Sequence, residues 1–200
     1  MNSAEVIRTR DANPTAFLST VFSAGKESVG FKVFPEHVCR SASSRELFEQ
    51  VLADPRVRKI VLRRDNRVET CVSCVRANAT GSYIRKNLDH VHVRIEPHEL
   101  QRFADAYDAW YDYLDERLVG QAGNVARVSY EELTASPKSA EAALRRVYAM
   151  LGVPSVAPAP GVRRDVPRQT LQPIHGRLQN YTALRDAFAG TNLAADFSCE

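Results

Sequence analysis

The spacing of hydrophobic residues changes within the stretch 59–82, which reads KIVLRRDNRVETCVSCVRANATGS. Its residues 60–62 form a short apolar run between charged residues, a pattern that predicts a strand buried on both faces. Four apolar residues then recur at three- and four-residue steps on one face of a predicted helix: Val68, Cys71, Val72 and Val75. Asn66, with Glu69 three residues later, forms a predicted capping pair. The stretch therefore predicts a strand, a basic turn and a helix.

Helical and strand-like patterns also fill the rest of the chain. Helices are predicted near residues 14–22, at 44–52, from 97 to about 118 and from 137 to 151. Further short strands are predicted at 29–34 and 125–128. The long helix carries an apolar stripe that we interpret as core: Phe103, Tyr107, Trp110, Leu114 and Leu118.

The length of 200 residues suits one well-buried domain, so we expect a single domain over residues 1–200. Residues 154–173 hold five of the ten prolines and are predicted to form an irregular loop. The net charge of +3 is small and the charged residues are interspersed, which argues against a nucleic-acid-binding protein. No stretch approaches the roughly 20 apolar residues of a membrane span, and no signal peptide is recognisable at the start. We therefore expect a cytoplasmic protein without a membrane span.

Two groups of residues contain typical metal ligands, but neither has the number and spacing of ligands that a metal site needs. Cys71 and Cys74 form a C-x-x-C, but no second ligand pair stands at a suitable spacing, and Cys71 falls on the apolar helix face. Core packing is the better interpretation. Three histidines, His90, His92 and His98, lie close together in sequence, but two ligands on a strand face do not make a site. We expect no metal.

An anion site is predicted at the turn between the strand and the helix. Ligands of α/β sheets bind at the carboxyl ends of strands, and a helix start offers free N–H groups and a partial positive charge. Arg63 and Arg64 stand at this position. Two adjacent guanidinium groups there would bind an anion strongly.

The run Leu62-Arg63-Arg64-Asp65-Asn66, ending in Val72-Ser73 and Arg76-Ala77, resembles a segment of the PAPS-dependent sulfotransferases, particularly of bacterial enzymes that sulfate carbohydrates. This segment binds the 3′-phosphate of the nucleotide. The resemblance implies that Arg64 and Ser73 hold that phosphate. Their spacing is one residue longer than in the cytosolic sulfotransferase pattern, so Arg63 is the alternative to Arg64.

Two later segments agree with this resemblance in their order. A strand, Tyr-Glu-x-Leu, a turn with proline and a helix ending in Leu-Gly-Val-Pro occupy residues 128–154. Residues 178–191 resemble the closing helix of the family, with Asn-Tyr near its start. The resemblance covers about residues 30–191. It implies an α/β domain with a mostly parallel sheet flanked by helices, the P-loop-like fold of sulfotransferases.

The resemblance also suggests further site residues. Lys32 matches the lysine of a family Lys-x-His, but Phe34 stands where the catalytic histidine would be. We therefore hypothesise that Glu36 or His37 takes the proton of the acceptor hydroxyl, with Glu5 a weaker candidate. Family loops in this region fold over the nucleotide, which makes four residues of the proline-rich loop candidate contacts: Arg163, Arg164, Arg168 and Gln169. The favoured alternative is a solvated basic loop.

The family's Ser/Thr-Gly loop for the 5′-phosphosulfate has no counterpart before Val29, and the first glycine is Gly25. The segment 23–28 does not match the ATP-type P-loop either. We therefore expect an N-terminally incomplete chain, with a degenerate relative as the alternative.

The resemblance implies a sulfotransferase that transfers a sulfuryl group from PAPS to a hydroxyl of a carbohydrate or another small acceptor, without a metal, if the missing loop is supplied. The rival hypothesis is a non-catalytic remnant that binds a nucleotide or a protein partner. A nucleotide kinase is disfavoured because the chain lacks a Walker lysine and a clear acidic pair for a metal.

Overall fold

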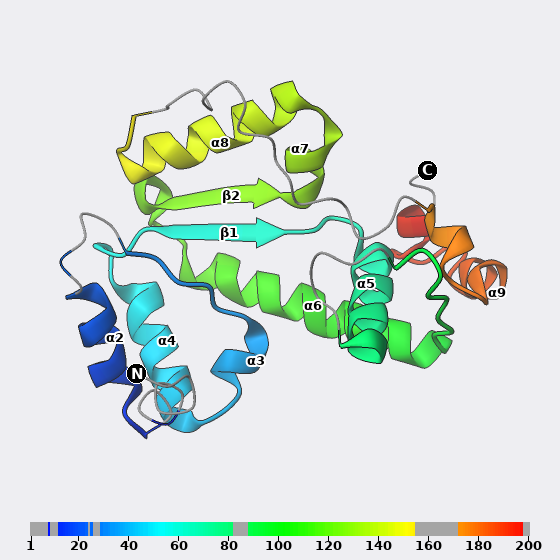
Figure 1. The fold of residues 1–200 in the computed structure, drawn as a ribbon, viewed down its shortest axis with the longest axis horizontal. Coiled ribbons are helices and arrows are strands. Elements are labelled where there is room, and N and C mark those ends of the chain that lie inside the picture. Colours follow the sequence, from blue (N-terminus) through cyan, green and yellow to red (C-terminus); the bar gives the residue numbers. More distant parts are fainter. Residues whose placement is uncertain are drawn as a thin grey trace. The chain divides into compact units, whose positions relative to one another are not determined.

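The computed structural model describes residues 8, 12–23, 25, 29–81, 88–154 and 172–197. The chain divides into two compact units. The first consists of residues 1–59 and 115–125, and the second of residues 60–114 and 126–200. Figure 1 labels the elements of both.

The first unit includes the helices α2 (Pro14–Phe22), α3 (Pro35–Val38) and α4 (Ala42–Ala53) and the short helix η1 (Ala122–Asn124). Helices α2 and α3 both contact α4. Helix α4 begins after Ser41, whose hydroxyl accepts a hydrogen bond from the backbone N–H of Ser44. This capping satisfies one of the backbone donors that every helix start leaves free. The predicted helices at 14–22 and 44–52 are confirmed within one or two residues.

The predicted strand at 29–34 is wrong, because the structure assigns no strand to these residues. Phe31 and Phe34 are exposed, and Phe34 serves as the extended residue before α3. A strand needs the hydrogen bonds of a neighbouring strand. The described residues supply none to this segment, so a strand-like sequence pattern remains unpaired.

The sheet consists of two parallel strands, β1 (Lys59–Arg63) and β2 (Val125–Ser129). Both arrows run in the same direction in Figure 1. Helix α7 (Tyr130–Ala135) follows β2 directly, and α8 (Pro137–Leu151) packs against α7. Buried residues of β2 and α8 form one hydrophobic cluster: Ala126, Val128, Ala143 and Val147.

Helices α5 (Arg67–Thr80) and α6 (Pro97–Arg117) supply the larger core of the second unit. Helix α5 buries the predicted face, with Val68 and Val72 fully inaccessible and Cys71 nearly so. The C-terminal segment, with α9 (Tyr181–Ala187) and the short helices η2 (Ile174–Gly176) and η3 (Ala194–Phe197), completes this cluster through Leu178, Leu184 and Phe197. Helix α9 is shorter than the predicted helix at 178–191.

The start of the C-terminal segment is held by a bridge rather than by a helix. Val93 and Leu178 form an isolated parallel bridge, and the Asn180 side chain bonds both backbone groups of Ile95. The bridge uses the Arg177 carbonyl and the Gln179 N–H, both of which bond Val93, and α9 begins only after it, at Tyr181.

The prediction that β1 is buried on both faces is wrong. Ile60 and Leu62 are 50% and 54% exposed, whereas Lys59 at the strand start is buried. Successive side chains of a strand point to opposite faces, and the described residues of the second unit cover only one face here. The fold class is as predicted: an α/β architecture with a small parallel sheet flanked by helices.

Candidate functional site

The predicted turn and helix lie at the carboxyl end of β1. Helix α5 begins after Asn66, whose side-chain Oδ1 accepts a 2.7 Å hydrogen bond from the Glu69 N–H. The predicted cap is therefore confirmed at Asn66. The Glu69 carboxylate does not complete a reciprocal capping box, because it pairs with Arg64 and Arg177 instead.

The backbone amides at this helix start are already occupied by side chains of the protein. The Glu131 carboxylate from α7 accepts hydrogen bonds from the N–H groups of Asp65 (2.9 Å) and Asn66 (3.5 Å). The Asp196 carboxylate accepts one from the N–H of Arg67 (3.1 Å). The expectation that the helix start offers free N–H groups to an anion is therefore wrong, because internal carboxylates use them.

Arg63 points to α6 and not to the helix start. One guanidinium nitrogen lies 3.2 Å from Asp108 Oδ1, and the group lies 5.0 Å from the centre of the Tyr111 ring. Burial and a hydrogen bond with Tyr107 raise the pKa of Tyr111, so its hydroxyl stays protonated and donates to the Leu62 carbonyl at 2.7 Å. These contacts hold β1 against α6.

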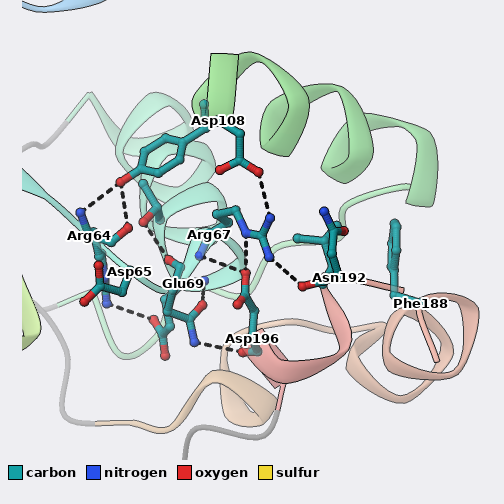
Figure 2. A network of polar contacts seen from close by, with 12 residues as sticks. Arg64, Asp65, Arg67, Glu69, Asp108, Phe188, Asn192 and Asp196 are labelled. Carbon is teal, nitrogen blue, oxygen red and sulfur yellow. Dashed lines mark hydrogen bonds and ion pairs between the residues drawn. The ribbon is translucent and has the colours of Figure 1, made fainter. Parts of the chain in front are cut away.

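Arg67 is the centre of a polar network that joins three parts of the second unit (Figure 2). Its guanidinium donates to Asp108 Oδ2 of α6 (2.7 Å), to Asp196 Oδ2 of η3 (2.8 Å) and to the Asn192 carbonyl (2.6 Å). Burial acts to lower the pKa of Arg67, but the hydrogen bonds to Asp196 and Asp108 outweigh it and raise the pKa. This arginine was not singled out from the sequence, where its acidic partners lie far away.

Arg64 is held at its backbone and at its side chain. The Tyr107 hydroxyl accepts from the Arg64 N–H (2.9 Å) and donates to the Arg64 carbonyl (2.7 Å). Thus Tyr107, which we had interpreted as core, fixes the turn. The Arg64 guanidinium lies 4.7 Å above the centre of the Tyr130 ring, 3.3 Å from Glu69 Oε2 and 3.8 Å from Glu131 Oε1. Its Nε is buried and has no hydrogen-bond partner among the described residues.

Two buried arginines of the second unit, Arg177 and Arg76, were given no role from the sequence. Arg177, from the segment before α9, is 5% exposed and donates to Glu69 Oε1 at 2.5 Å. Arg76 of α5 is 2% exposed and donates to the Leu88 carbonyl. Burial and the charge of Arg177 lower the pKa of Arg76. The only sequence signal for Arg177 was its position just before the Asn-Tyr of the closing segment.

Ser73 shares a helix face with two of these charged residues. Glu69, Ser73 and Arg76 stand at i, i+4 and i+7 on α5, a spacing that aligns side chains. Ser73 is half-buried, and among the described residues it has no hydrogen-bond partner. Arg64 pairs with Glu69, which stands four residues before Ser73 on α5, whereas Arg63 pairs with Asp108 of α6.

The remaining predicted site residues are not part of this network. Lys32, Glu36 and His37 are exposed and belong to the first unit. His37 Nδ1 accepts a 3.3 Å hydrogen bond from the Phe34 N–H at the start of α3, where its ring also contacts that of Phe34. Arg168 and Glu5 lie outside the described residues. The roles given to these residues stay predictions.

The cysteines and histidines form no metal cluster among the described residues. Cys71 is 3% exposed inside the core of the second unit, which confirms its interpretation as a packing residue. Burial, with smaller contributions from Cys74 and Glu99, raises the pKa of the Cys71 thiol to about 12. Such a thiol is a poor metal ligand and a poor nucleophile at neutral pH. His90, His92 and His98 are all exposed.

The fold and the paired arginines at the carboxyl end of β1 belong to an α/β protein. Comparison with protein families identifies which class it is: the model of the sulfotransferase family matches residues 17–158. The chain belongs to the sulfotransferase family. The family generally uses PAPS as its sulfuryl donor. No significant match is found among curated proteins or among solved structures.

The match includes β1, α5, β2, α7 and α8, and it ends before α9. The predicted family is thereby confirmed. None of the helices in the described part of the chain is long and apolar enough to cross a membrane.

Proposed function

We propose that this protein binds PAPS and transfers its sulfuryl group to a hydroxyl of a carbohydrate or another small acceptor. Membership of the sulfotransferase family supports the reaction class. The observation that supports the nucleotide site is the Arg64 guanidinium. Its Nε is buried without a hydrogen-bond partner among the described residues, and its ion-pair partner Glu131 Oε1 lies 3.8 Å away, beyond hydrogen-bond distance. A buried donor without an acceptor is costly, and a phosphate oxygen would satisfy it.

The geometry favours Arg64 over Arg63 as the phosphate ligand. Arg63 is already paired with Asp108 and stacked on Tyr111, so binding an anion there would break contacts between β1 and α6. Arg64 lies on Tyr130 and next to Glu69, on the side of α5 that carries Ser73. Side chains therefore supply this phosphate site, because internal carboxylates occupy the helix-start amides.

The reaction is a displacement at sulfur. The acceptor oxygen forms a bond to sulfur, the bond between sulfur and the bridging phosphate oxygen breaks, and 3′-phosphoadenosine 5′-phosphate leaves. The hydroxyl proton passes to a base, for which we propose Glu36 or His37. Arg64 and Ser73 position the nucleotide and do not take part in bond exchange, because such transfers depend mainly on placement and charge stabilisation. Lys32 and Arg168 are proposed as further nucleotide contacts.

The assignment of the base has its own test. Turnover is measured with the Glu36→Gln and His37→Gln variants and with both changes together. The double variant is expected to lose at least about 100-fold in kcat, the usual contribution of a general base. Retained turnover would contradict the assignment of Glu36 or His37 as the base and would not bear on the nucleotide site.

Calorimetric titration tests the nucleotide site itself. We expect the full chain to bind 3′-phosphoadenosine 5′-phosphate more tightly than AMP, which lacks the 3′-phosphate. Arg64→Gln should remove that preference, since it deletes the charge that binds the phosphate. The matched control is Arg145→Gln, because Arg145 is an exposed residue of α8 that pairs with Glu141 one helical turn away. Equal affinities for both nucleotides would contradict the proposal, and binding without turnover would favour the non-catalytic remnant.

A further inference from the structure

The start of the short helix α3 is held by a histidine. Phe34 precedes the helix and has an apolar side chain, and Pro35 at the first helical position has no N–H group. A Glu or Gln side chain at the third helical position often accepts a hydrogen bond from the N–H of the residue before the helix. His37 stands at this position, and its Nδ1 accepts a 3.3 Å hydrogen bond from the Phe34 N–H.

This hydrogen bond fixes which ring nitrogen of His37 carries the proton. A neutral imidazole has one N–H group and one nitrogen with a lone pair. Because Nδ1 accepts from the Phe34 N–H, the lone pair is at Nδ1 and the proton is at Nε2. The Phe34 ring also packs edge-on against the His37 ring, with 5.4 Å between the ring centres. Both contacts hold the imidazole in one orientation.

The same bond makes His37 a poor proton acceptor. A proton taken up by the ring would have to enter at Nδ1, where it would face the Phe34 N–H, and that N–H would lose its acceptor. A general base must present its lone pair to the proton that it removes. In this arrangement His37 presents its lone pair to the backbone at the start of its own helix.

Glu36, the preceding residue, has no such contact. It is exposed in the first turn of α3. No hydrogen bond or ion pair joins its carboxylate to another residue in the described part of the chain. An ionised carboxylate has two oxygens that both accept hydrogen bonds. Glu36 is therefore the member of this pair that can accept from an external hydroxyl without breaking an existing contact.

We propose that Glu36 is the general base for the acceptor hydroxyl and that His37 is a positioning residue, which holds the turn of α3 that carries Glu36. The hydroxyl proton moves to a carboxylate oxygen of Glu36 while the hydroxyl oxygen forms its bond to sulfur and the bond from sulfur to the bridging phosphate oxygen of PAPS breaks. These two roles rest on the proposed function, and they resolve the choice between Glu36 and His37.

Amide hydrogen exchange at Phe34 tests the contact with His37 without any substrate. In the full chain the Phe34 N–H should exchange roughly fivefold more slowly than in His37→Ala, the factor that corresponds to one capping interaction. His37→Gln should keep this protection, because its side-chain oxygen can accept from the same position. Equal exchange rates in the three proteins would overturn the role of His37.

Turnover tests how the two roles are divided. Glu36→Gln should lower kcat at least about 100-fold. His37→Gln should stay within about twofold of the wild type, and His37→Ala should lie roughly fivefold below it, because only the alanine variant releases the turn. A loss in His37→Gln as large as that in Glu36→Gln would overturn the proposal, since the reaction would then need the imidazole. Glu46→Gln in α4 and His98→Gln in α6 alter exposed residues and are the matched controls.

The outcomes separate this proposal from the proposed function. Sulfuryl transfer that continues unchanged in Glu36→Gln would overturn Glu36 as the base and leave the reaction itself established. Absence of transfer from PAPS by the wild type would remove the proposed function and with it the role of Glu36. The exchange rate of the Phe34 N–H would still decide whether His37 holds the start of α3.

Discussion

The arginines of the segment 63–76 have different roles although they look alike in sequence. Arg67 pairs with Asp108 and Asp196, and Arg63 pairs with Asp108 of α6. The buried Nε of Arg64 has no hydrogen bond within the described part of the chain and lies 3.8 Å from Glu131 Oε1. The sequence could place this basic segment at the end of a strand, but it could not sort its members. The partners that decide their roles are distant, since Arg67 meets Asp108 and Asp196 at separations of 41 and 129 residues.

Replacing Arg67 should destabilise the protein strongly. Arg67→Ala leaves Asp108 and Asp196 without their shared partner, and removing one member of a buried ion pair costs about 3 kcal/mol of unfolding free energy. Arg145→Ala removes an exposed pair within α8 and should cost about 0.5 kcal/mol or less. Urea unfolding of both variants checks the difference. Similar losses in the two variants would mean that the Arg67 network contributes little to stability.

The buried Cys71 thiol predicts a loss of stability at alkaline pH. Burial raises the pKa of Cys71 from its usual value near 9.0 to about 12, so between these values the folded state keeps a proton that the unfolded state has lost. The folded state then binds more protons, and the unfolding free energy falls as pH rises, by at most about 1.4 kcal/mol per pH unit from this group. Urea unfolding at pH 8 and pH 10 should show a steeper decline for the wild type than for Cys71→Ala. Parallel declines would show that Cys71 ionises equally well in the folded state.

The helices of this chain were more predictable than its strands, because helix signals are local. The helix boundaries at Asn66, at Ser136-Pro137 and at Gly152 follow from capping residues within a few positions. The strand expected at 29–34 failed, and the burial expected for Ile60 and Leu62 failed, because both depend on what packs or pairs from elsewhere in the chain. The sequence also did not reveal that Glu131 accepts hydrogen bonds from the amides at the start of α5, because this contact joins distant parts of the chain.

Two caps with similar local geometry should differ in their effect on stability. The Asn66 side chain caps α5 and also donates to the Asp196 carbonyl at 2.8 Å, and Asn66 is buried. Ser136 caps α8 at an exposed position. We expect Ser136→Ala to lower the unfolding free energy by about 1 kcal/mol and Asn66→Ala by roughly 2 kcal/mol or more, because the latter leaves a buried acceptor unpaired. Chemical denaturation measures both, and equal losses would contradict the added role of the Asn66 amide.

At the scale of the whole molecule, the family assignment covers segments of both compact units, because the match extends over residues 17–158. The order of motifs in the sequence was enough to predict that family. The candidate site was predictable only in part. Arg64 and Ser73 were proposed from the resemblance, whereas the ion pair of Arg177 with Glu69 joins segments that lie far apart in the sequence. That the chain forms a single domain over residues 1–200 stays a prediction.

Phosphorus NMR of 3′-phosphoadenosine 5′-phosphate in the presence of the protein tests the account most directly, because its two phosphates give separate signals. We predict that the wild type shifts or broadens the 3′-phosphate signal, and that Arg64→Gln abolishes this effect while Arg145→Gln does not. A 3′-phosphate signal that stays unchanged with wild-type protein at millimolar nucleotide would contradict the claim that Arg64 binds this phosphate.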